Sequence, residues 1–270
     1  IRDSDTTDQV QSDGISISTG RLNHDAEQLP AMILRAPDLE TRGTVVCVSD
    51  TGKSELFAEG RLRPIVRDLV QGGYVVIAAD LFGQGEFTET GDALDAQRMW
   101  FQPGDERGWR TFSGYTYGYN HPLFAKRVHD VLTLINYADE EDTKPLHLIG
   151  IGSHAGAIAA AARMQSGDAI ERTFLDTRGF RFETLTAQDD PMFVPGAVKY
   201  GDVDALIALC LPGQVDVVGD ASSLVDSVAG SVGKSSSVRW HENVQDLAAV
   251  VRGALVGSAS GGGASVGGEN

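Results

Sequence analysis

The stretch Gly73–Glu86, with the sequence GYVVIAADLFGQGE, gives the clearest indication of the fold. Its first half, Tyr74–Ala79, is apolar and partly β-branched, which is typical of a strand buried on both faces. Asp80 then precedes a turn in which Gly83 and Gly85 permit the positive φ that a sharp reversal requires. We therefore expect a buried strand that ends in a tight turn, with the Asp80 carboxylate bonded to amides of that turn.

Short apolar runs and longer amphipathic stretches alternate on both sides of this strand. Each apolar run predicts a strand, and each stretch with apolar residues at helical spacing predicts a helix. The strands are expected at 31–35, 44–49, 74–79, 145–151, 173–175, 215–218 and 238–240, and the helices at about 55–71, 121–138, 155–164, 203–211 and 244–255. Alternation at this spacing requires crossover connections onto a mostly parallel sheet. The sequence thus predicts a three-layer α/β fold in which helices cover both faces of the sheet.

Composition divides the chain into a central domain and two polar ends. Residues 1–17 are polar and aperiodic, so a linker or frayed arm is expected there. Residues 257–270, GSASGGGASVGGEN, are expected to form a flexible Gly/Ser-rich tail. A single domain is predicted for residues 18–256. Two long connections within it, 86–120 and 177–201, leave the sheet at the carboxyl ends of strands, where open α/β sheets bind ligands.

The chain is strongly acidic. Its 270 residues include 22 Lys and Arg against 38 Asp and Glu, which gives a formal net charge of −16. This charge repels phosphate backbones and anionic lipids, so no nucleic-acid partner is expected. No apolar run approaches the roughly 18 residues that span a bilayer, and no membrane insertion is expected. The chain begins at Ile1 without Met and without a signal-peptide pattern, so we expect a fragment, a processed product or an excised domain, and a companion domain in a longer precursor is a candidate partner.

The two cysteines, Cys47 and Cys210, each lie in an apolar stretch, where buried free thiols are expected. The sequence has no CxxC pattern and no Cys/His cluster with zinc spacing. It therefore predicts neither a metal nor a cofactor.

The stretch Gly73–Glu86 closely resembles a signature of the α/β-hydrolase superfamily, in which a GY-apolar-D-x-x-G-x-G-(E/S) pattern ends a buried strand. The order of the predicted elements over about residues 30–256 matches the same superfamily. Within it, the stretches Tyr115–Val131 and Gly179–Asp202 look like an acetyl-xylan-esterase-like branch. The resemblance implies a serine hydrolase that acts on a carbohydrate ester or another small ester without a cofactor. It also implies an extracytoplasmic location.

Members of this superfamily carry the nucleophile on a strained strand-to-helix turn, called the nucleophile elbow, which has the sequence pattern G-x-S-x-G. The corresponding stretch here is Leu148–Gly156, LIGIGSHAG. Counting from the strand places Gly152 in the nucleophile position, whereas counting from the helix places Ser153 there, with Ala155 replacing a glycine. The motif departs from the pattern in both alignments. Ser153 is the nucleophile that the resemblance implies.

The resemblance also implies a base and an acid, which follow the nucleophile in the chain. His241 follows the last predicted strand, where the superfamily places its histidine. The usual acid position holds Ser222, so Asp220 is the candidate acid and Asp176 is the alternative. Asp220 is equally suited to cap the next helix, and His241 equally suits a surface position at a helix start.

The remaining candidates would bind the substrate. Backbone amides are expected to stabilise the oxyanion, one from His154 and one from Asp50 or Thr51. The connection Phe87–Tyr119 contains 8 of the 19 aromatic residues of the chain. Most of them are expected to pack this long connection, but four are candidates to line the substrate site: Trp100, Trp109, Tyr115 and Tyr117.

Two functions remain open. The first is a serine ester hydrolase of the acetyl-esterase or carbohydrate-esterase type, which acts through Ser153, His241 and an acid. The second is a catalytically inactive α/β-hydrolase-like domain that serves as a binding or structural module of a larger protein. The shifted elbow and the serine at position 222 favour the second. A Rossmann-type turn at Gly150-x-Gly152-x-x-Ala155 is a weaker alternative, because such a turn belongs on the first strand of its unit.

Overall fold

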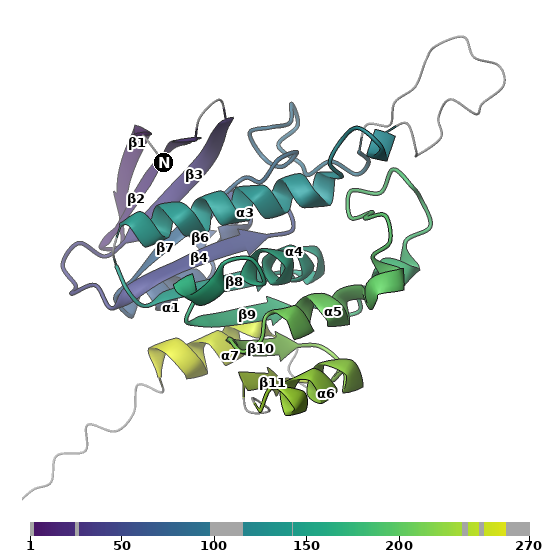
Figure 1. Ribbon diagram of the computed structural model, residues 1–270. Helices are drawn as coiled ribbons and strands as arrows, with labels where there is room; N and C mark the ends of the chain where they lie inside the picture. The colour runs from purple at the N-terminus through teal and green to yellow at the C-terminus, as the bar shows by residue number, and fades with distance from the viewer. Residues whose placement is uncertain are drawn as a thin grey trace, which may run out of the picture.

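The computed structural model describes residues 3–24, 27–97, 116–141, 143–233, 237–242 and 246–257. These residues build a sheet of nine strands with helices on both sides (Figure 1). In spatial order the strands are β1 (Asp3–Ser12), β2 (Ile15–His24), β3 (Glu27–Arg35), β7 (Tyr74–Ala79), β4 (Gly43–Ser49), β8 (Leu146–Ile151), β9 (Arg172–Asp176), β10 (Gln214–Val218) and β11 (Val238–Trp240). Neighbours from β7 to β11 run parallel, whereas β1, β2 and β3 join antiparallel at the β7 side.

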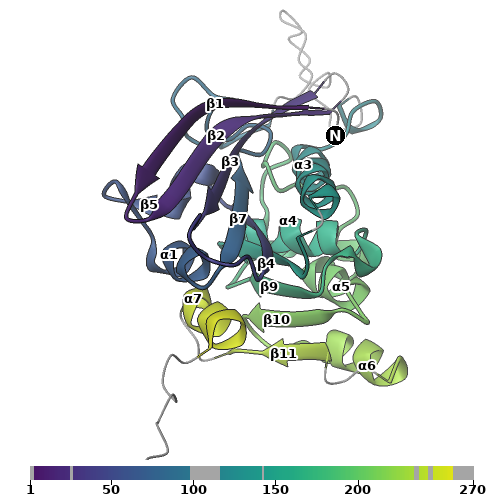
Figure 2. The ribbon, with the colours of Figure 1, turned by 90° about the vertical axis from the view of Figure 1, so that its left-hand side faces the viewer.

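Helices cover the sheet on its two faces, as Figure 2 shows. One face packs against α1 (Pro64–Gln71) and α7 (Leu247–Val251). The other packs against α3 (Leu123–Glu140), α4 (Ser153–Arg163), α5 (Asp202–Leu209) and α6 (Ser223–Ser231). Val45 and Cys47 of β4 contribute to the first apolar layer and Val46 and Val48 to the second. Burial on both faces explains why β4 is continuously apolar, and the predicted three-layer α/β fold is confirmed.

Several smaller features also match the sequence-based expectations. Cys47 and Cys210 are buried free thiols, and burial raises the pKa of each to about 12. Asp80 accepts hydrogen bonds from the backbone N–H groups of Lys53 (2.8 Å) and Glu86 (3.0 Å), so it secures the turn that follows β7. Within the part of the chain that the structure describes, no helix is long and apolar enough to cross a membrane.

The amino-terminal segment is not the linker or frayed arm expected for residues 1–17. Its described part forms β1 and the start of β2, paired in register from Asp3↔Asn23 to Ser12↔Ile15. The turn between the strands is Asp13-Gly14, with φ of 52° and 75°. A two-residue Asp-Gly loop with positive φ at both positions is a strong hairpin signal. The hairpin was not predicted because the polar composition of residues 1–17 was interpreted as a linker. The boundary predicted at residue 18 therefore falls within β2, while residues 258–270 of the predicted tail lie outside the described residues.

The helix predicted for about 55–71 is also shorter than expected. Residues Lys53–Leu56 form a 3₁₀ turn, and a small hairpin of β5 (Phe57–Ala58) and β6 (Arg61–Leu62) follows it. The helix α1 begins only at Pro64. Proline is favoured at the first helical position, because its missing N–H has no partner there in any case.

Candidate active site

The turn between β8 and α4 holds the candidate nucleophile. Gly152 lies at this turn with φ of 100° and ψ of 157°, a conformation that is essentially restricted to glycine. Ser153 is the first residue of α4 and is half-buried, and His154 is exposed. The alignment counted from the strand places Gly152 at the elbow, and Gly152 is the residue with the unusual backbone conformation between β8 and α4. The special position therefore carries no side chain, and Ser153 lies one residue beyond it, inside the helix.

The side chain of Asp50 fills the space beside Gly152. A Cβ built on Gly152 would lie 2.4 Å from both Cγ and Oδ2 of Asp50. The other oxygen, Oδ1, accepts a hydrogen bond of 2.7 Å from the backbone N–H of Ala155, so the carboxylate caps the first turn of α4. Burial raises the pKa of Asp50, while the Ala155 N–H and the nearby His154 act in the opposite direction. The Asp50 carboxylate thus fills the space that a side chain at position 152 would need.

Hydrogen bonds hold the loop after β4 in position. The side-chain amide of Gln84 donates to the carbonyl oxygens of Ser49 (3.1 Å) and Asp50 (2.7 Å). The N–H of Thr51, one of the two predicted oxyanion donors of this loop, donates to Oε2 of Glu55 (3.1 Å). This amide is therefore already engaged within its own loop. The sequence predicted a role for the backbone N–H of Asp50 only. The structure shows that its side chain contacts the elbow, beside Gly152 and Ala155.

Lys53 follows in the same loop, and its charge is paired within the protein. Its ammonium contacts the Asp80 carboxylate and lies 2.6 Å from Oε1 of Glu86. Two carboxylates therefore compensate this charge, and Lys53 joins the loop after β4 to the turn after β7.

The predicted base, His241, follows β11 and is anchored by its backbone N–H, which donates to the carbonyl of Val217 (2.8 Å). Its Nε2 lies 2.9 Å from Oδ1 of Asp216, a buried residue in the middle of β10. The second oxygen of Asp216 accepts a hydrogen bond of 2.7 Å from Nε of Arg172. In a Ser-His-Asp triad the nitrogen Nε2 faces the nucleophile. Here that nitrogen faces a carboxylate, and among the described residues no hydrogen bond joins His241 to Ser153.

Neither predicted acid is the hydrogen-bond partner of His241. Asp176 is buried at the end of β9, and both of its oxygens bind the guanidinium of Arg178, at 2.8 Å and 2.5 Å. Asp220 does not cap α6 either, because the capping residue is Ser222, whose Oγ accepts from the N–H of Val225. The acid that does bind the imidazole, Asp216, was missed. Its sequence signal is an Asp inside the apolar run Val215–Val218, where burial demands charged or hydrogen-bonding partners.

Of the four aromatic candidates, Trp100, Trp109 and Tyr115 lie outside the described residues. Tyr117 is described, and its hydroxyl donates to the carbonyl of Gln188 (2.5 Å) while its ring packs on Phe193. Burial, with a smaller effect of two nearby carboxylates, raises the pKa of Tyr117 to about 12. Tyr117 therefore joins the two long connections, 86–120 and 177–201, to each other.

A row of aromatic rings borders the amino-terminal end of α4. The ring of His154 meets Phe180 edge-on at 5.0 Å between centroids, Phe180 meets Phe182 at 5.1 Å, and Phe182 meets Phe124 of α3 at 5.5 Å. These contacts seat the connection after β9 against the candidate site. The three phenylalanines are buried, so His154 carries the exposed ring of this row.

Comparison with known proteins places the chain by structure. No protein-family profile matches the sequence, and no curated protein matches it either. A protein of Bacteroides fragilis NCTC 9343, provisionally assigned as an acetyl xylan esterase, is similar with a TM-score of 0.64 at 12% identity, over 88% of this chain and 69% of that one. A glucuronoyl esterase from Solibacter usitatus is similar with a TM-score of 0.58 at 12% identity, over 88% and 80%.

A promiscuous esterase from a marine bacterial metagenome is similar with a TM-score of 0.60 at 10% identity, over 94% of this chain and 83% of that one. The similar structures thus include carbohydrate esterases. The chain has the α/β-hydrolase fold, as the resemblance implied. Identities this low carry the fold and not the chemistry, because unrelated functions share a fold.

Proposed function

We propose that this chain is a non-hydrolytic α/β-hydrolase-fold domain that binds a ligand or a companion domain at the carboxyl edge of its sheet. The observation that carries the proposal is the Asp50 carboxylate beside Gly152. Covalent ester hydrolysis requires a nucleophile at the elbow and a free base within hydrogen-bond reach. Here the elbow residue is a glycine, its surroundings hold a negative charge, and the imidazole nitrogen that would act as base faces Asp216.

Electrostatics supports the same proposal. The attack of an alkoxide on an ester develops negative charge on the carbonyl oxygen, and catalytic sites place hydrogen-bond donors there. The Asp50 carboxylate beside the elbow would repel a negative charge on the carbonyl oxygen. Its Oδ1 already accepts the hydrogen bond of the Ala155 N–H. The ligand class we propose is carbohydrate, because the structures similar to this chain include carbohydrate esterases and the exposed ring of His154 lies beside the elbow.

A second candidate, serine ester hydrolysis, is favoured by the pair of His241 and Asp216, since an imidazole bonded to a buried carboxylate is a common catalytic unit. In this candidate Ser153 attacks the carbonyl carbon of the ester, and its hydroxyl proton passes to His241. The tetrahedral oxyanion takes hydrogen bonds from backbone amides near His154, and its collapse breaks the bond to the alkoxide, which leaves as the alcohol with the proton returned by His241. Water then hydrolyses the acyl-serine. For this sequence to run, the ring of His241 has to turn over, so that Nδ1 replaces Nε2 at Asp216 and Nε2 faces Ser153.

Hydrolysis of 4-nitrophenyl acetate separates the two candidates. Wild type, Ser153→Ala and His241→Ala are compared at equal concentration, with the folded state of each checked by circular dichroism. We expect all three rates to equal spontaneous hydrolysis. Multiple turnovers by the wild type would overturn the proposal. A loss of 100-fold or more in both variants would then establish the second candidate, because removal of a triad member costs orders of magnitude in rate.

Calorimetric titration with xylan oligosaccharides tests the binding half of the proposal. We expect the wild type to bind and His154→Ala to bind at least fivefold more weakly, since His154 is exposed at the rim. The change Glu183→Gln, on the surface of the connection after β9, is the control that leaves the affinity unchanged. Absence of binding by the wild type would contradict the carbohydrate assignment.

A further inference from the structure

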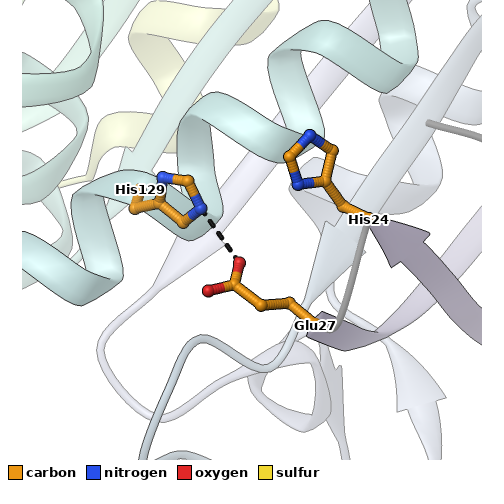
Figure 3. A group of neighbouring side chains, drawn as sticks. All are labelled: His24, Glu27 and His129. Atoms are coloured by element: carbon orange, nitrogen blue, oxygen red, sulfur yellow. Dashed lines mark hydrogen bonds and ion pairs between the residues drawn. The ribbon is translucent and has the colours of Figure 1, made fainter.

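Three side chains that could ligate a metal gather where β2 ends and β3 begins (Figure 3). His24 is the last residue of β2, and Glu27 is the first residue of β3. His129 belongs to α3, which passes over this corner of the sheet. The strand pairing of His24 with Glu27 and the packing of α3 thus bring together residues that are 102 positions apart along the chain.

The ligand atoms of these residues lie close to one another. Nε2 of His129 is 3.0 Å from Oε2 of Glu27, and the rings of His24 and His129 are 6.3 Å apart between centroids, in an edge-on arrangement. One ligand atom from each residue lies within 4.8 Å of the other two. Figure 3 shows both imidazoles on the same side of the strands, with the Glu27 carboxylate beneath them.

We propose that His24, Glu27 and His129 bind a divalent transition-metal cation of the zinc class. Two imidazoles and one carboxylate are ligands that zinc accepts in proteins, whereas Mg²⁺ and Ca²⁺ prefer oxygen ligands alone. Zinc bonds of about 2.0–2.2 Å place tetrahedral ligand atoms about 3.3–3.6 Å apart. His129 Nε2 and Glu27 Oε2, at 3.0 Å, have to separate by only a few tenths of an ångström. His24 has to approach by an ångström or so, which a rotation of its half-buried side chain supplies.

Coordination replaces the hydrogen bond between His129 and Glu27. Nε2 of His129 gives up its proton, either to Nδ1 by a change of tautomer or to the solvent, and its lone pair then binds the metal. The three protein ligands leave one tetrahedral position for water. The formal net charge of −16 attracts cations to the surface of the molecule. The bound metal would join the β2–β3 hairpin to α3, and so stabilise the folded chain.

Calorimetric titration of the full chain with ZnCl₂ tests the site. The wild type is compared with His24→Ala, Glu27→Gln and His129→Ala, and with His121→Ala, an exposed histidine outside the cluster, as the matched control. We expect one zinc per chain in the wild type and in His121→Ala. Each of the three cluster variants should bind at least tenfold more weakly. MgCl₂ should give no binding in any of them.

Two further measurements distinguish the loss of a metal ligand from misfolding of a variant. X-ray absorption of the zinc-loaded wild type should count two imidazole ligands per metal. Zinc should raise the melting temperature of the wild type and of His121→Ala, but not that of the cluster variants, because a ligand that binds only the folded state stabilises it. Zinc binding that survives all three substitutions, an imidazole count other than two, or no binding by the wild type would overturn the assignment.

Discussion

At the scale of single residues, the candidate site depends on the close contact between Gly152 and the Asp50 carboxylate. The backbone of Gly152 has φ of 100° and ψ of 157°, and its missing side chain leaves room for the Asp50 carboxylate. Replacement by alanine adds backbone strain of about 1–3 kcal/mol. It also adds a clash with the carboxylate, of similar size. We therefore expect Gly152→Ala to lower the free energy of unfolding by about 3 kcal/mol or more, measured by urea denaturation.

Two further variants separate the clash from the strain. Gly179 also has positive φ, 70°, but a Cβ there meets nothing within 4 Å, so Gly179→Ala should cost about 1 kcal/mol from strain alone. In a double-mutant cycle, Asp50→Ala should remove the clash, so that Gly152→Ala costs at least 1 kcal/mol less in that background. Equal costs in both backgrounds would show that the carboxylate does not fill this space.

At the scale of elements, α4 lies unusually close to β9. A Cβ on Gly156 of α4 would lie 1.9 Å from the carbonyl oxygen of Asp176, which is backbone and cannot move aside. We expect Gly156→Ala to lower the free energy of unfolding by at least 3 kcal/mol or to prevent folding, as reported by urea denaturation and by soluble yield.

Gly230 in α6 supplies the matched control for this substitution. It is also a helical glycine, but a Cβ there meets nothing within 4 Å. Gly230→Ala should therefore stabilise the chain by about 0.5–1 kcal/mol, because alanine favours the helix. A similar effect of the two substitutions would mean that helix propensity, and not the contact with β9, governs α4.

The elements that the sequence predicted well are those whose burial is two-sided. The runs Val45–Val48 and Tyr74–Ala79 are apolar because helices cover both faces of the sheet at these strands. The edge strand β1 has no such pattern, since its residues 8–12 are exposed, and it was predicted as an arm. The start of α1 was misplaced for a local reason, because apolar residues before Pro64 continue the helical spacing without forming a helix.

At the scale of the whole molecule, contacts between residues far apart in the sequence form the parts of the site that the sequence did not predict. The order of strand, turn and helix around Gly152 was visible in the sequence, and so was the departure of this turn from the G-x-S-x-G pattern. The carboxylate of Asp50 meets Ala155 across 105 residues, and Asp216 meets His241 across 25. Such contacts depend on strand register and on side-chain direction, and local patterns specify neither. The cluster of His24, Glu27 and His129 has the same origin.

The dependence of global stability on pH tests the core of this acidic molecule. His147 of β8 is buried beside Tyr74, its Nδ1 has no hydrogen-bond partner within the described chain, and burial lowers its pKa from 6.5 to about 4, with a smaller contribution from Arg172. Between these two values the unfolded state binds more protons than the folded state, so stability falls as the pH falls from 6.5 towards 4. A shift of this size corresponds to about 3 kcal/mol.

We expect His147→Leu to remove that part of the pH dependence. Urea midpoints at pH 7, 5.5 and 4.5 should fall less steeply in the variant than in the wild type, since leucine fills the apolar site without a titratable group. Ile149→Val, in the same strand, is the control, and it should cost about 1 kcal/mol at every pH because it deletes only a buried methyl group. A wild-type slope that persists in His147→Leu would place the acid sensitivity in the carboxylates instead.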